Sequence, residues 1–161
     1  MSTYLRPMAR LYDDDLVVWA ETQAAALRAA ARAKLNVPVA VDWENVAEEI
    51  EQLARSERRE LASRLFRLLT HLAKWRYEPQ RRSRSWRATI GERRREIARL
   101  LADSPSLAAT LPEVFARVYA EARGQAADET GLPLSTFPET CPFTIEAALD
   151  PHFWPEAVDR N

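Results

Sequence analysis

The residues that interrupt helices are concentrated at a few places in this chain, and that distribution constrains its fold more than any other feature. The ten prolines cluster at junctions, and the three glycines are too few for a sheet built from hairpins. Between the junctions, apolar residues recur at three- and four-residue steps, which is the spacing of one face of an α-helix. The sequence therefore predicts an all-α protein.

The longest predicted helix begins after Asp42, a good N-cap, and runs to Trp75, shortly before Pro79. A continuous helix of about 33 residues would be roughly 50 Å long, enough to form the spine of a bundle. Its expected core face is Trp43, Val46, Ala47, Ile50, Leu53, Leu61, Leu65, Leu68, Leu72 and Trp75.

Shorter helices are predicted over residues 14–34, 83–101 and 112–130. Ser83 or Ser85 would cap the second of these, and Gly131 would end the third. Residues 132–161 form a tail rich in proline and aromatic residues, with one short helix over 144–149. We therefore expect a single-domain helical bundle over residues 1–161, with the tail packed across it.

The size and the cysteine content agree with a reducing compartment. A chain of 161 residues can bury a substantial core, and its single cysteine, Cys141, excludes an intrachain disulfide. The first residues lead into the acidic run Asp13–Asp15 instead of the apolar core of a signal peptide, and no stretch approaches the ~18 apolar residues of a membrane span. We expect a cytoplasmic protein that does not associate with membranes.

The charge is strongly polarised along the chain. Residues 55–99 contain fifteen of the 23 lysines and arginines but only five acids, although the whole chain has a formal net charge of −1. Such a segment indicates either ion pairs within the fold or a cationic surface for an acidic partner.

A candidate basic face lies within this segment. It consists of Lys74, Arg76, Arg81, Arg82, Arg84, Trp86 and Arg87. Guanidinium groups match phosphate or carboxylate oxygens, and an adjacent indole could stack on a base. In the alternative interpretation Trp86 is a core anchor, and the arginines are solvated or pair with Glu44, Glu48, Glu49 and Glu51. The sequence pI of about 6.2 disfavours a dedicated nucleic-acid-binding protein.

Two charged residues fall on inward positions of the predicted helices. Glu57 lies between Leu53 and Leu61, and Arg93 lies between Ile90 and Ile97. A Glu57–Arg93 ion pair inside the fold is the simpler interpretation. The alternative is an enzyme that uses Glu57 and His71 as acid and base in a cleft between the long helix and the third.

The sequence gives no indication of a metal or a cofactor. Carboxylate-bridged metal sites in bundles use Glu-x-x-His pairs, but Leu68 and Leu149 precede His71 and His152 at that spacing. Glycine-rich phosphate loops and hydrolase signatures are absent from the sequence. We expect Cys141 to be a buried thiol, and we predict no metal and no cofactor.

Ordered blocks of residues occur along nearly the whole chain, at 12–15 with Trp19 and Gln23, 44–45, 48–51, 55–61, 71–75, 82–87, 104–107, 129–132 and 137–144. In identity and spacing these blocks closely resemble the bacterial helical family catalogued as domain of unknown function 29. The resemblance implies a single, mostly α-helical domain, and it implies no substrate, cofactor or catalytic residue. One departure is at residues 34–41, around Pro38, which look like a longer or altered first connection.

The resulting hypothesis is a non-enzymatic interaction module that docks an acidic macromolecule through its basic face. Three partners satisfy the charge pattern: the acidic surface of another protein, a second copy of this chain through the acids at 44–51, and a nucleic-acid backbone.

Overall fold

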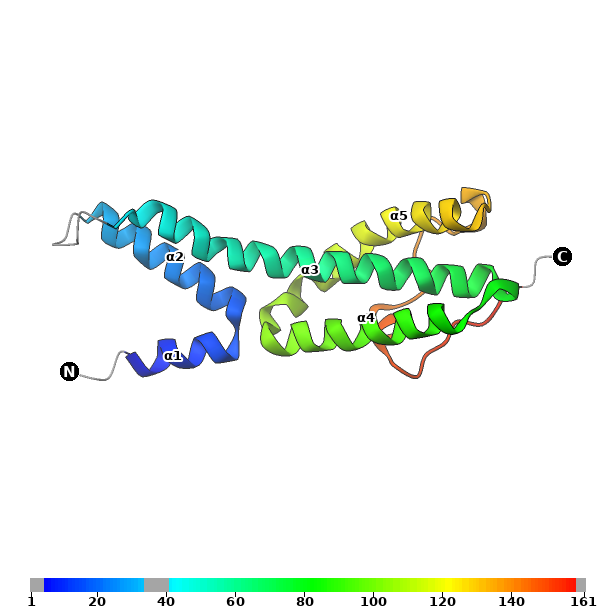
Figure 1. Ribbon diagram of the computed structural model, residues 1–161, viewed down its shortest axis with the longest axis horizontal. Helices are drawn as coiled ribbons and strands as arrows, with labels where there is room; N and C mark the ends of the chain where they lie inside the picture. Colours follow the sequence, from blue (N-terminus) through cyan, green and yellow to red (C-terminus); the bar gives the residue numbers. More distant parts are fainter. Residues whose placement is uncertain (1–4, 34–40, 159–161) are drawn as a thin grey trace. The chain divides into compact units, whose positions relative to one another are not determined.

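The computed structural model describes residues 5–33 and 41–158, and this part of the chain contains helices and no strands. The α-helices are α1 (Leu5–Asp14), α2 (Leu16–Arg32), α3 (Trp43–Tyr77), α4 (Arg84–Asp103), α5 (Leu111–Thr130) and α6 (Ile145–Leu149) (Figure 1). Short 3-10 helices cover Pro79–Arg81, Pro105–Thr110 and Leu134–Thr136. The prediction of an all-α, single-domain helical bundle with a long central helix is confirmed. The extent of the domain, residues 1–161, stays a prediction, and the altered connection at 34–41 lies largely outside the described residues.

The long central helix is continuous, as its spacing predicted. α3 has 35 residues, and the Oδ1 atom of Asp42 accepts a hydrogen bond from the backbone N–H of Asn45 at 3.2 Å. Its predicted core face was wrong at two positions, because Val46 and Leu53 are 39% and 43% exposed. Ala47, which was predicted, and Ala54, which was not, are fully buried one position further along, since small side chains allow neighbouring helices to approach closely.

Contacts divide the bundle into two compact units, residues 1–60 with 100–108 and residues 61–99 with 109–161. In the first unit, Arg28 of α2 donates to Glu44, Glu48 and Glu51 of α3 at 2.8–3.3 Å, and Arg58 of α3 donates to Glu21. These ion pairs place α2 antiparallel to the first half of α3.

The first unit also contains a helix that the sequence did not predict. α1 precedes Asp15, and Pro7 lies in its first turn, where a missing N–H group costs no hydrogen bond. Asp15 then caps α2 by accepting the N–H of Val18 at 2.9 Å, and it also accepts the N–H and hydroxyl of Ser106 at 2.7 and 3.0 Å. Burial alone would raise the pKa of Asp15, but these hydrogen bonds hold it below its usual value.

The second unit contains the larger apolar core. Fully buried leucines at 61, 65, 68 and 72 line α3, and Ile90 and Ile97 line α4, as their spacing predicted; Leu69 is also fully buried and was not predicted. α4 begins where Ser83 accepts the N–H of Trp86 at 3.2 Å. α5 ends at Gly131, whose φ of 73° is the left-handed conformation that glycine adopts without strain.

The tail after α5 packs across this second unit. Phe137 is fully buried, with its ring centroid 5.2 Å from that of Tyr77, and the hydroxyl of Tyr119 donates to the carbonyl of Pro138 at 2.8 Å. Farther along, the ring of Trp154 lies 4.8 Å from that of Trp75. The tail, drawn in orange and red in Figure 1, thereby completes the core of the unit.

Candidate functional site: an arginine face on helix α4

The seven residues of the predicted basic face do not share one surface. Lys74 is 6% exposed, and its Nζ atom lies 2.5 Å from Oε2 of Glu129 on α5 and 4.4 Å from the ring centroid of Trp86 on α4. The ammonium group therefore joins three helices within the second unit. Trp86 is half-buried, and one face of its ring is covered by that cation.

Arg82 binds the tail. Its Nε atom donates to the carbonyl of Trp75 at 2.8 Å, its Nη2 atom donates to the carbonyl of Pro155 at 3.3 Å, and its guanidinium lies 4.9 Å from the Trp75 ring. Arg94, which sequence reasoning did not single out, acts in the same way on Ala148 and Phe153, at 2.8 and 2.9 Å. These two arginines hold the tail on the bundle.

Arg76 and Arg81 lie near the end of α3. Arg76 is half-buried and lines a pocket formed with the tail. Arg81 is on the following 3-10 helix, where its side chain is 55% exposed and pairs with buried Glu78 at 3.2 Å. Neither side chain lies on α4.

The exposed arginines of α4 form a separate surface, which we call the α4 arginine face. It consists of Arg84, Arg87, Arg95 and Arg99, all of them exposed. At 100° per residue these four positions fall within about 120° of the helix circumference, over a length of about 22 Å. Within residues 5–33 and 41–158, no carboxylate forms an ion pair with any of the four.

Two members of this face, Arg95 and Arg99, were missed from the sequence. The prediction rested on the contiguous run of arginines at 81–87. The exposed face instead follows the four-residue step from Arg87 through Gly91 to Arg95 and Arg99. The side chain of Arg95 lies beside Gly91, where a Cβ atom would be only 3.3 Å from its Nη1 atom. The helical period, not the local density of arginines, identifies the surface.

Three of the glutamates expected to pair with the arginines of the basic face pair with other arginines. Glu44, Glu48 and Glu51 pair with Arg28, and Arg55 also pairs with Glu48 and Glu51. The hydrogen bond from Arg28 holds the pKa of Glu51 below its usual value. These ion pairs all lie within the first unit, so these carboxylates are paired with arginines of the same unit.

The Glu57–Arg93 ion pair and the use of Glu57 and His71 as acid and base stay predictions. Arg93 donates to Glu96 at 2.6 Å and to Glu92 at 3.2 Å, and Glu57 is half-buried. His71 is half-buried with its Nδ1 atom 2.8 Å from the carbonyl of Arg67, and burial lowers its pKa. The imidazole is therefore neutral at pH 7.

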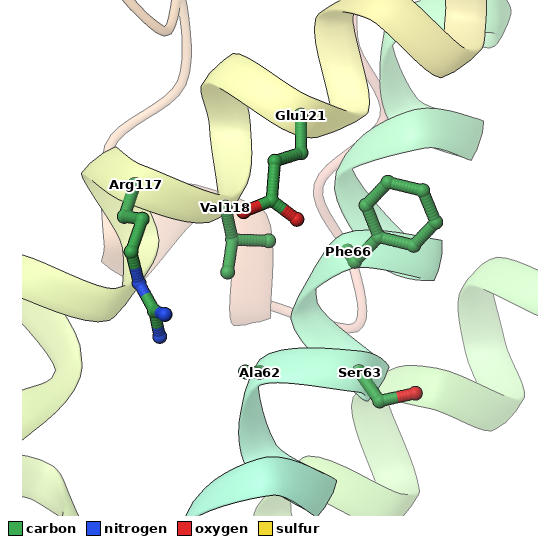
Figure 2. Close-up of a pocket in the computed structure, with 6 residues that line it drawn as sticks. All are labelled: Ala62, Ser63, Phe66, Arg117, Val118 and Glu121. Carbon is green, nitrogen blue, oxygen red and sulfur yellow. The ribbon is translucent and has the colours of Figure 1, made fainter.

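The second unit has pockets whose linings bear on the proposed acid–base pair of Glu57 and His71. One of about 220 Å³ lies between α3 and α5 and is lined by Ala62, Ser63, Phe66, Arg117, Val118 and Glu121. Figure 2 shows Phe66 projecting from α3 and the Glu121 carboxylate from α5, beside Val118. Another, of about 390 Å³, includes Cys141, which is half-buried and whose thiol pKa is raised by burial. The third contains Arg76, and neither Glu57 nor His71 lines any of the three.

Two features are absent from residues 5–33 and 41–158. No group of three or more histidine, cysteine, aspartate or glutamate side chains there could hold a metal ion. No helix there is both long enough and apolar enough to cross a membrane.

Comparisons with known proteins give a family and a fold. The model of the family described as "Domain of unknown function DUF29" matches residues 11–154. A crystal structure of an α-helical protein of unknown function from Rhodospirillum rubrum is similar, with a TM-score of 0.70 and 28% sequence identity over 88% of this chain and 90% of that chain. No curated protein matches.

Proposed function

Because this chain belongs to the DUF29 family, whose description states no activity, we propose a function from its surface: it is a non-enzymatic interaction module that docks an acidic partner through the α4 arginine face. The observation that carries the proposal is the row of four exposed arginines without a carboxylate partner among the described residues. Guanidinium groups that face water on one side of a rigid helix are available to carboxylates or phosphates.

An acidic protein surface is the partner we favour over a nucleic acid. Binding to single strands relies on aromatic rings on which bases stack. The nearby rings already carry cations, with Lys74 4.4 Å from Trp86 and Arg87 5.1 Å from Trp154. The face therefore offers charge and guanidinium hydrogen bonds, which carboxylates satisfy.

The test compares binding to poly-glutamate and to a single-stranded DNA, each fluorescently labelled, at about 50 and 300 mM salt. The test variant carries R84A, R87A, R95A and R99A. The matched control carries R10A, R59A, R67A and R117A, which removes the same charge from arginines that are also exposed but lie elsewhere. Thermal unfolding establishes that both variants are folded.

Poly-glutamate should bind the wild type at low salt, and the test variant should bind about tenfold or more weakly, since each exposed charge pair contributes about 0.2–1 kcal/mol. The control should stay within about twofold of the wild type. Equal losses in both variants would show that net charge, and not this face, determines binding. Binding of DNA alone would overturn the choice of partner.

A further inference from the structure

A pocket between the end of α3 and the tail contains a cation whose hydrogen-bonding groups are not used. It has a volume of about 610 Å³, and its lining includes Arg76, Phe143, Thr144, His152, Trp154 and Glu156. Pockets for small ligands commonly have volumes of about 300–1,000 Å³ and combine aromatic walls with a few polar groups. We call this the Arg76 pocket.

The guanidinium of Arg76 is framed by aromatic rings. Its central carbon lies 5.7 Å from the ring centroid of Tyr77 and 6.0 Å from that of Phe143. The Nε atom is buried without an acceptor, and within the described chain no carboxylate or carbonyl accepts a hydrogen bond from this guanidinium. The Nε atom has therefore lost water without gaining an acceptor, which is costly, and no acceptor within the described chain orders the remaining guanidinium donors.

The other arginines that contact the tail differ from Arg76. Arg82 and Arg94 each donate two hydrogen bonds to carbonyls, and those carbonyls lie at or beside the pocket wall. The backbone carbonyl of Arg76 accepts the N–H of Val158 at 3.0 Å, so the main chain at this position is fixed while its side chain stays unpaired. Nη1 of Arg94 is also buried without an acceptor, but Arg94 does not line the pocket, so among the lining residues it is Arg76 that presents an unused donor.

The lining also limits the charge of the ligand. Glu156 is exposed at the pocket and disfavours a ligand with several negative charges, such as a nucleotide triphosphate. A single carboxylate can accept the fork of Arg76, and a ring can pack against Phe143 and Phe153 of the lining. We propose that the Arg76 pocket binds a small aromatic monocarboxylate, with the guanidinium of Arg76 as the carboxylate receptor.

The first probe is phenylacetate, and its uncharged counterpart is phenylacetamide. Binding to the full chain is measured by saturation-transfer NMR and by the fluorescence of the tryptophans. Phenylacetate should bind with a dissociation constant of about 1 mM or lower, and phenylacetamide should bind at least about tenfold more weakly. Absence of phenylacetate binding at about 10 mM would overturn the proposal.

The Arg76→Gln variant should bind phenylacetate about tenfold or more weakly than the wild type, because a charge-assisted hydrogen-bond pair is lost. Arg81→Gln, on the neighbouring 3-10 helix and outside the pocket lining, is the matched control and should bind normally. If Arg76→Gln does not fold, Arg76→Lys provides the test, since lysine keeps the charge but cannot form the bidentate contact. Unchanged affinity in the folded variant would overturn the assignment.

This inference is independent of the α4 arginine face. The variant with R84A, R95A and R99A should bind phenylacetate within about twofold of the wild type, because none of these side chains lines the pocket; Arg87 is kept, since its guanidinium lies 5.1 Å from the lining residue Trp154. Loss of phenylacetate binding in that variant, with Arg76 intact, would show that the carboxylate binds the surface of α4 and would overturn the pocket assignment.

Discussion

Three arginines of the first unit and the four arginines of the α4 arginine face in the second differ in their partners. In the first unit, Arg28, Arg55 and Arg58 each pair with glutamates of that same unit. In the second unit, the four arginines of the α4 arginine face have no carboxylate partner in the described chain. The charge balance of the sequence follows the same contrast, since residues 1–60 with 100–108 contain eight basic and twelve acidic residues, whereas residues 61–99 with 109–161 contain fifteen basic and twelve acidic residues. The local supply of carboxylates decides whether an arginine is satisfied inside the fold or remains available at its surface.

The same contrast is found between adjacent residues of α4. Arg94 is 4% exposed and donates to two carbonyls of the tail, whereas Arg95 is exposed and lies over Gly91. One step along a helix turns a side chain by 100°, which here separates a structural cation from a surface cation. Substitutions at these two positions provide the strongest test of the distinction.

The largest expected effect is that of Arg94→Met. Methionine keeps much of the side-chain volume but removes the donors that satisfy the carbonyls of Ala148 and Phe153. Leaving buried acceptors unpaired costs about 1–3 kcal/mol each, so we expect a decrease of about 3 kcal/mol in the free energy of unfolding. Urea denaturation measures this change.

The matched control is Arg95→Met on the same helix. Because Arg95 is exposed, the free energy of unfolding should change by no more than about 0.5 kcal/mol. Similar decreases for the two variants would mean that the distinction between inner and outer arginines of α4 has no energetic basis.

A smaller effect is expected where Lys74 and Glu129 pair. Burial alone would raise the pKa of Glu129, but hydrogen bonds from Lys74 and Gln125 hold it below its usual value of 4.5. The stabilisation is therefore fully present above pH 4.5 and is lost as the pH falls through the folded-state value. Glu129→Gln should lower the free energy of unfolding by about 1–2 kcal/mol at pH 7, since it leaves the nearly buried ammonium unpaired while Glu129 itself is partly solvated.

The pH dependence distinguishes this pair from general acid destabilisation. The difference between wild type and Glu129→Gln, measured by urea denaturation, should shrink as the pH is lowered below 4.5. Asp128→Asn, which removes an adjacent exposed carboxylate, should show little difference at any pH. A difference that stays constant down to acid pH would contradict the ion-pair explanation.

Local rules were sufficient to predict most of the fold from the sequence. The caps at Asp42 and Ser83, the glycine at 131 and the three- and four-residue spacing gave the helices and most of their buried faces. The two errors in the predicted core face of α3 had one cause. Val46 and Leu53 were assigned to the core because they are hydrophobic, but the alanines beside them are buried instead. Which side of a helix allows a neighbouring helix to approach closely depends on both helices, so the sequence of one helix alone does not reveal it.

The candidate sites were less predictable, because they depend on residues distant in sequence. Lys74 could not be assigned to the interior without Glu129, which lies 55 residues later. Likewise, Arg94 is explained only by the carbonyls at 148 and 153, and the Arg76 pocket exists only because the tail returns to α3. The sequence showed an excess of positive charge in residues 55–99, but only the fold shows which arginines there have no carboxylate partner in the described chain.

The smallest effect should come from the first unit, where Arg28 lies among Glu44, Glu48 and Glu51 near the surface. Arg28→Gln removes the cation and leaves three carboxylates close together, so the variant should be slightly less stable than the wild type at low salt. Because solvent and salt screen these charges, the difference should narrow when the salt concentration is raised from about 0.05 to 0.5 M.

Arg32→Gln, one turn later on α2 and exposed, removes the same charge without removing an ion pair within the described chain and should show a smaller salt dependence. Urea midpoints at the two salt concentrations decide between the variants. An Arg28→Gln effect that is independent of salt would place this arginine with Arg94, as a side chain whose hydrogen bonds matter more than its charge, and would remove the contrast between the units.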